Sequence, residues 1–359
     1  MNRSQDDFIT QRHPLLSLLV CPCTGADLVY HEFDRASALI SALDGRLYPI
    51  IDGVVVMAPV AQQVQKLCKD FLDGINSRLP SMKEYDADLT KATLFRGSEN
   101  KIDQWHAGEM EFWEEKFRRL GESEKPQNPG WNRTLPRQEI IKRLPEGIQN
   151  SVLLEIGCGA SHTLYDTWQD CIPNYIGLDL SFYACLLTKR TFPHGLFIQA
   201  SAENPPFKRE SIDNIFAYGA FHHLPDHEGN ILHILKFLRP GGHVVGADPL
   251  LKEKVPRLRR RDGKAVCNDG VTRNSPHNEW IDWQNLLDLL GMDADVVAEL
   301  REYSPLRSIM VEFLYDGLGL RNKSFVRLLM LLDRVWLDSI GKCHGALGPA
   351  AIHYAIRKR

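Results

Sequence analysis

The second half of the chain alternates between short apolar runs and amphipathic stretches. Strand-like runs are predicted within residues 151–157, 174–181, 198–207, 211–224 and 235–249, and helical segments lie between them. Strands that alternate with helices form a mostly parallel sheet that is covered by helices on both faces. The pattern therefore predicts an α/β fold, and residues 350–359 are expected to close the sheet as an antiparallel strand.

The first part of the chain follows a different pattern. Residues 14–58 form a compact unit with two β-rich runs separated by the turn dipeptide Asp52-Gly53. Residues 61–125 are helical in pattern, and Gly121 is a helix-stop signal. We therefore divide the chain into a β-rich module (1–60), a helical linker and cover (61–149), a core (150–250), and a helical cover with the closing strands of the core (251–359).

Composition and charge exclude several classes of protein. The 359 residues are 43% hydrophobic and 25% charged, which is typical of a globular protein. A net charge of −3 gives no global attraction to nucleic acid or to an anionic membrane. Because no apolar run approaches the ~20 residues of a membrane helix, we expect a cytoplasmic protein without a membrane partner. Its eight cysteines are then expected to be reduced.

A glycine turn follows the first predicted strand of the core. Residues 151–157 read SVLLEIG, and Cys158 and Gly159 follow. A dinucleotide-binding turn would be G-x-G-x-x-G, but the last position here is His162. Glu155 would also place a negative charge beside the pyrophosphate. Both features argue against NAD and favour a ligand with no phosphate and with a cationic amine, such as S-adenosylmethionine (SAM).

The order of the motifs resembles the class I SAM-dependent methyltransferases, which have a Rossmann-like sheet. Their first motif is an acidic residue followed by G-x-G, as in Glu155, Gly157 and Gly159. Asp179 ends the second strand about 20 residues later, the spacing at which a carboxylate meets ribose hydroxyls; a helix N-cap is the alternative role. The resemblance also implies that SAM is bound by these further residues: Leu180, Ser201, Ala202 and Glu203.

Residues 14–58 resemble the small zinc-ribbon-like domain that accompanies or activates some methyltransferases. The resemblance rests on Cys21-Pro22 and on the YPIIDGVVVM hairpin at residues 48–57. A structural zinc site needs two Cys-x2-Cys pairs, whereas this sequence has Cys21-x-Cys23 and no second pair nearby. We therefore expect a structural module that binds no metal.

The reacting groups are expected after the fourth strand, because ligands of open α/β sheets bind beyond the carboxyl ends of the strands. His222 is a candidate general base, with His223 as the alternative. Tyr218 is a second candidate catalytic residue, as a group that could take the amine proton of SAM. Residues 129–136 are one candidate cover, in which Trp131 and Arg133 would close over the amino acid end of SAM. The C-terminal tail is the other, and Trp131, Trp280 and Trp283 are candidates for cation–π contact with the sulfonium.

These features predict a SAM-dependent methyltransferase that acts on a small molecule or biosynthetic intermediate. One alternative is a SAM cyclase of the same fold, which would form azetidine-2-carboxylate and methylthioadenosine. A second alternative is an RNA methyltransferase, although the acidic balance makes nucleic acid a poor partner, and the basic run at residues 257–261 is expected to be a solvated loop. A third is a catalytically silent scaffold. The oligomeric state and the acceptor atom stay open.

Overall fold

The computed structural model describes residues 13–33, 36–58, 66–70, 102–122, 131–159, 164, 167–168, 172–250, 281–302, 307, 310–339 and 351–359. Within this part of the chain one sheet has eleven strands in the order β1-β2-β3-β4-β7-β6-β5-β8-β9-β11-β10. The strands are β1 (Leu28–Phe33), β2 (Ala36–Ser41), β3 (Leu47–Ile51), β4 (Val54–Val56), β5 (Leu153–Ile156), β6 (Tyr175–Asp179), β7 (Leu196–Gln199), β8 (Ile212–Tyr218), β9 (Leu238–Pro249), β10 (Ala294–Glu302) and β11 (Ala351–Lys358).

The centre of the sheet is parallel. Strands β7, β6, β5, β8 and β9 pair in parallel, and the order reverses at β5, where β6 lies on one side and β8 on the other. Strand β11 is antiparallel to both of its neighbours, β9 and β10. The predicted Rossmann-like α/β sheet with an antiparallel last strand is confirmed, and the reversal beside β5 creates the crevice in which such sheets bind ligands.

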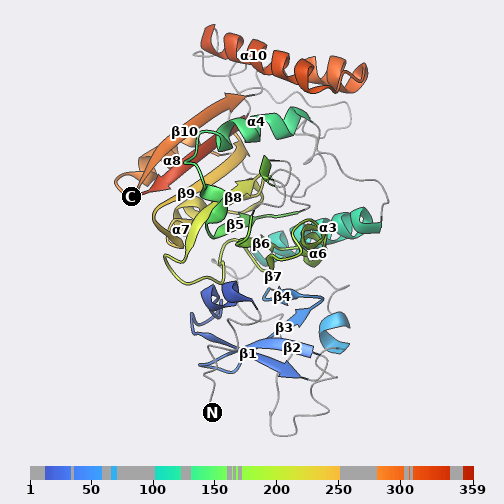
Figure 1. Ribbon diagram of the computed structural model, residues 1–359, viewed down its shortest axis with the longest axis vertical. Helices are drawn as coiled ribbons and strands as arrows, with labels where there is room; N and C mark the ends of the chain where they lie inside the picture. The colour runs from blue at the N-terminus through green and yellow to red at the C-terminus, as the bar shows by residue number, and fades with distance from the viewer. Residues whose placement is uncertain are drawn as a thin grey trace.

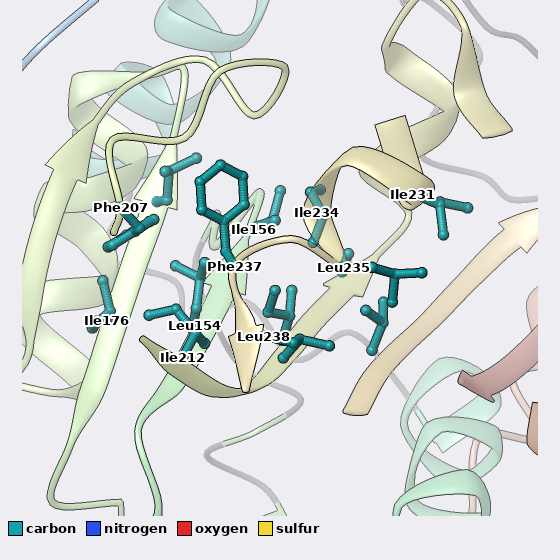
Figure 2. Packing of buried hydrophobic residues seen from close by; sticks show 14 of the residues in the cluster. Leu154, Ile156, Ile176, Phe207, Ile212, Ile231, Ile234, Leu235, Phe237 and Leu238 are labelled. Carbon is teal, nitrogen blue, oxygen red and sulfur yellow. The ribbon is translucent and has the colours of Figure 1, made fainter. Parts of the chain in front are cut away.

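Helices cover both faces of the parallel centre of the sheet, where the strands are buried on both sides. Leu153, Tyr175 and Phe216 face α4 (Trp131–Ile141) and α6 (Phe182–Thr191). The alternate positions, Leu154 and Ile176 among them, face α7 (His227–Ile234) and α8 (Trp283–Leu290). Figure 2 shows part of this second layer, where Ile234 of α7 lies near Ile156, at the end of β5.

The two remaining long helices lie outside these layers. Helix α3 (Ile102–Glu122) runs beside α6, and α10 (Lys323–Ser339) lies at the upper end of the molecule, beyond α4 (Figure 1). Short 3-10 helices occur at Pro14–Leu18, Ile148–Asn150 and Phe221–His223, and a π-helix occurs at Val311–Gly317. Among the residues that the structure describes, no helix is both long enough and apolar enough to cross a lipid bilayer.

The N-terminal module is part of the same sheet. The predicted hairpin is present, with β3 and β4 antiparallel about Asp52 and Gly53, both of which have positive φ. Val55 of β4 then pairs in parallel with Ile198 of β7. Leu19 and Phe207 form a further bridge between module and core. The module therefore extends the edge of the sheet that lies nearest to the predicted adenine-binding segment.

Candidate active site

The glycine turn lies where the strand order reverses. Gly157 and Gly159 have φ of +64° and +50°, a left-handed backbone that favours glycine. A Cβ atom on Gly157 would lie 2.7 Å from Cβ of Ala220, which follows β8. The carboxyl ends of β5 and β8 therefore approach so closely that a side chain at Gly157 is excluded.

Asp179 fastens this turn to the end of β6. Its Oδ2 accepts a hydrogen bond of 3.0 Å from the Gly159 amide, and its Oδ1 accepts one of 2.9 Å from the Ser181 amide. The N-cap of α6 is Ser181, whose Oγ accepts from the Ala184 amide. Burial raises the pKa of Asp179 to about 6. The carboxylate thus lies at the crevice and does not serve as the N-cap of the helix.

Glu155 and Tyr218 lie on the face of the sheet that α4 covers. Glu155 is buried and accepts a 2.6 Å hydrogen bond from the Tyr175 hydroxyl. The Tyr218 hydroxyl is buried without a hydrogen-bond partner, and its pKa is raised mainly by burial, with Arg137 and Glu155 as the charges that act on it. The Arg137 guanidinium lies 5.0 Å from the Tyr218 ring centroid. Opposite charges therefore flank one buried hydroxyl.

The segment after β7 follows the predicted third-strand motif. Ser201 and Glu203 are buried, and Ser201 Oγ accepts a 3.2 Å hydrogen bond from the Glu203 amide. Ala202 is partly buried and packs against the hydrophobic core. The Leu180 carbonyl accepts from Gln199 Nε2 at 3.0 Å, which ties the ends of β6 and β7 together. These four residues and Asp179 thus border one stretch of the crevice.

His222 is held by a buried carboxylate at the end of β9. Its Nδ1 lies 3.2 Å from Asp248 Oδ1, and Tyr354 donates a 2.9 Å hydrogen bond to Asp248 Oδ2. His227 Nε2 lies 3.7 Å from Asp248 Oδ1. Burial alone would raise the pKa of Asp248, but the bonds from His222 and His227 hold it well below its usual range. His222 Nε2 is buried and has no hydrogen-bond partner.

Helix α3 covers the other side of the two histidines. The Trp113 ring lies 5.0 Å from the His223 ring, and Trp113 Nε1 donates a 2.6 Å hydrogen bond to Glu109. Glu109 Oε2 lies 3.6 Å from His223 Nδ1. Further along the helix, Phe117 lies 3.2 Å from where a Cβ of Gly159 would be. Helix α3 therefore covers the glycine turn; it lies within the predicted helical cover (61–149), but outside residues 129–136 and the tail, the two segments expected to close over the ligand.

A second carboxylate of α3 lies beside Asp179. Glu114 is buried, and its carboxylate oxygens make no hydrogen bond that meets normal geometric criteria. Its pKa is raised to about 7, mainly by burial, with the Asp179 charge adding to the effect and the Ser181 hydroxyl opposing it. Sequence reasoning missed Glu114, Trp113 and Arg137, because only the fold brings them to the crevice.

Several predicted residues lie elsewhere. The prediction that Trp283 contacts a sulfonium is wrong, because its indole is buried in the core, 5.3 Å from the Tyr354 ring, and donates to Glu299. Residues 131–136 belong to α4, and the side chains of Trp131 and Arg133 lie outside the described residues, as do Trp280 and residues 257–261. In the described part of the chain no cluster of three potential metal ligands occurs.

Comparison with known proteins identifies the core. Residues 154–246 match a family model described as methyltransferase domain. The predicted SAM-dependent methyltransferase core and its cofactor, SAM, are thereby confirmed. Residues 12–53 match a second model, the Trm112p-like proteins, which agrees with the predicted resemblance of the N-terminal module to a methyltransferase activator.

Individual relatives match parts of the chain. The phthiotriol/phenolphthiotriol dimycocerosates methyltransferase of Mycobacterium leprae is 36% identical over 138 residues, which is 34% of this chain and 51% of that protein. A UPF0434 protein of Saccharophagus degradans is 51% identical over 43 residues, 12% of this chain and 65% of that protein. The solved structure of the [4+2]-cyclase SpnF matches 63% of this chain and 80% of its own, with 16% identity and a TM-score of 0.42. The chain thus spans about half the length of the methyltransferase relative.

Proposed function

We propose that this protein transfers a methyl group from SAM to a small molecule or a biosynthetic intermediate. The observation that carries the proposal is the pair of buried carboxylates, Glu155 and Asp179, on either side of a left-handed glycine turn at the reversal of strand order. This arrangement repels phosphate and suits a ligand with a cationic amine and a ribose diol.

The residues around Tyr218 suit the amino acid end of SAM, which is a zwitterion. Arg137 offers a guanidinium for a carboxylate, and Glu155 offers a carboxylate for an ammonium. The Tyr218 hydroxyl, buried without a partner, would gain one from such a ligand, which would offset the cost of burying it unpaired. Asp179 would hold the ribose, and Leu180 with residues 201–203 would border the adenine.

SAM supplies a methyl group made electrophilic by its sulfonium. An acceptor hydroxyl or ammonium must lose a proton when it is methylated, and His222 is the residue placed to take it. Asp248 holds Nδ1 of His222, so the unpartnered Nε2 is the nitrogen left for the substrate proton, as in other carboxylate–histidine pairs. The proposed base is therefore His222, and Asp248 positions it.

The acceptor class is supported by the curated relatives. Those that match the core are named for the methylation of phthiotriol and phenolphthiotriol dimycocerosates. Their names favour a low-molecular-weight acceptor over RNA for this chain too. The burial of Glu109, Glu114 and His222 around the crevice also favours a small acceptor that can be enclosed.

The same enclosure favours one second candidate, cyclisation of SAM. In that reaction the α-amine would attack Cγ, the Cγ–sulfur bond would break, methylthioadenosine would leave, and the amine proton would pass to His222. Glu155 counts against this course, because a carboxylate stabilises the protonated amine.

Binding and turnover together test the proposal. Calorimetry is expected to show SAM binding, and Arg137→Gln should weaken SAM and S-adenosylhomocysteine but leave methylthioadenosine, which has no amino acid group, unchanged. Lys142→Gln, an exposed change just beyond α4, is the matched control. Methylthioadenosine and a cyclic amino acid from SAM alone, detected by mass spectrometry, would overturn methyl transfer. RNA binding whose affinity falls steeply with salt would favour the RNA methyltransferase.

A further inference from the structure

Helix α10 exposes an apolar stripe on the side opposite to the one it buries. Val326, Leu329 and Asp333 are buried against the molecule, whereas Leu328, Leu331 and Val335 are 49%, 56% and 55% exposed. At 3.6 residues per turn these three exposed positions share one face, about half a turn from the buried ones. A helix that only capped a globular core would be polar on this face.

Positive charge borders the stripe. Lys323, Arg327 and Arg334 are exposed and lie along one edge of the apolar positions. Asp338 is the one exposed acidic side chain of this helix, because Asp333 is buried with Arg307 at 3.4 Å. The chain as a whole has a net charge of −3, so this face reverses the overall sign.

Among the helices and strands that the structure describes, none covers this face of α10, and its apolar side chains are exposed. The helix lies at the outer end of the molecule in Figure 1, with α4 and β10 on its inner side. Val326 packs with Leu135 and Tyr315, and together with the Arg307–Asp333 pair these contacts fix which side of the helix faces outward. The turn before it adds Phe313 and Leu318, both of which are exposed.

Although the overall charge and hydropathy predicted no membrane partner, the local pattern on α10 differs, and we propose that α10 docks the protein, lying flat, on an anionic lipid surface. An apolar stripe flanked by arginine and lysine is the pattern of helices that lie in the membrane interface, where apolar side chains enter the acyl boundary and cations meet lipid phosphates. A second copy of the chain fits less well, because two such faces would bring together three cations and one carboxylate from each side. A nucleic acid would leave the apolar stripe unused. This inference is independent of the proposed methyl transfer.

Co-sedimentation of the full chain with vesicles tests the docking. Vesicles of equal parts phosphatidylglycerol and phosphatidylcholine are expected to bind the protein, vesicles of phosphatidylcholine alone to bind it weakly, and added salt to release it. Arg327→Glu with Arg334→Glu should lower the partition coefficient by at least ~10-fold, because each basic residue near the surface contributes to the attraction. Leu331→Ser with Val335→Ser should also lower it.

The control reverses the same charges elsewhere. Arg209→Glu with Lys236→Glu changes two exposed residues far from α10 along the chain and should leave the partition unchanged. The proposal would be overturned if the parent protein did not bind the vesicles. It would also be overturned if the charge reversal on α10 and the control charge reversal lowered the partition coefficient equally. So would a dimer, measured by analytical ultracentrifugation, that Leu331→Ser with Val335→Ser dissociates, since that result would assign the face to a second copy. Calorimetry with SAM on each variant separates this outcome from a failure of the active site.

Discussion

Asp248 and His222 form a buried carboxylate–imidazole pair, with Oδ1 and Nδ1 3.2 Å apart and the second carboxylate oxygen held by Tyr354. The pair joins the turn that follows β8 to the last residues of β9, where Asp248 is still paired with Ile352 of β11. Both side chains are almost completely buried, so loss of the carboxylate would leave the buried Nδ1 of His222 without this partner. The relationship therefore contributes to stability as well as to the orientation of the imidazole.

The pair predicts a specific loss of stability in acid. The pKa of Asp248 is held below its usual range, so its contribution is fully present above the unfolded pKa of about 3.9 and is lost as the pH falls toward the folded value. Asp248→Asn should lower the free energy of unfolding by about 3 kcal/mol at pH 7, the scale for breaking a buried pair. Urea unfolding measures this, and the gap between parent and variant should narrow at pH 3. A gap that stays constant would contradict the prediction.

Asp179 is predicted to make SAM binding depend on pH. Its pKa is raised to about 6, and the ionised carboxylate accepts hydrogen bonds from the two ribose hydroxyls more strongly than the neutral acid does. Affinity for SAM should therefore fall as the pH drops below about 6, and Asp179→Asn should weaken binding by about 1–3 kcal/mol. Calorimetry at pH 7.5 and pH 5.5 tests both, with the exposed Asp288→Asn as control. Unchanged affinity in Asp179→Asn would remove the ribose role.

Glu114 is predicted to destabilise the ligand-free protein at neutral pH. A carboxyl whose folded pKa is raised from 4.5 to about 7 binds more protons in the folded state, so stability falls as the pH rises between those values. Glu114→Gln should remove that fall and raise the free energy of unfolding by about 1–3 kcal/mol at pH 7.5. Thermal unfolding across pH 5 to pH 8 measures it. A variant less stable than the parent at every pH would show that Glu114 acts as a structural cap for α6.

The glycine turn predicts a difference between two glycines of similar conformation. Gly157 and Gly25 both have positive φ, but a Cβ on Gly157 would meet Ala220 at 2.7 Å and a Cβ on Gly25 would meet nothing within 4 Å. Gly25→Ala should therefore cost only backbone strain, about 1 kcal/mol, and Gly157→Ala should cost clearly more. Chemical denaturation of the two variants makes the comparison. Equal losses would mean that the turn can move away from Ala220.

The features that could be predicted from the sequence are those whose conformation depends on residues close together in the chain. The glycine turn, Asp179 and the Asp52-Gly53 hairpin follow from local conformational rules, and their order along the chain was enough to predict the sheet. Arg137 was missed because the sequence does not show that α4 packs over the end of β8, which is what brings Arg137 to the Tyr218 ring. The carboxylates and tryptophan of α3 were missed for a different reason. Nothing local in residues 102–122 indicates that this helix crosses the turn at Gly159, because packing over a distance of about 40 residues decides it.

Trp283 shows that residue type alone does not reveal whether a side chain contacts a ligand or is buried in the core. An aromatic residue near a predicted ligand suggests cation–π contact, but the same ring can fill the core equally well. Here the N-cap of α8 at Asp282 turns Trp283 inward toward Tyr354. The amphipathic pattern of α8 was present in the sequence, but which side of the sheet it covers was not.

The pairing of β4 with β7 has a consequence for biosynthesis. Val55 and Ile198 are about 140 residues apart in the chain, so on the ribosome the N-terminal hairpins are made long before their neighbour in the sheet. During that interval β4 is a strand with one open edge, the kind of edge that recruits foreign strands. Completion of β7 closes it. A nascent chain stalled before residue 196 should therefore aggregate or engage chaperones, and one stalled well beyond residue 250 should not.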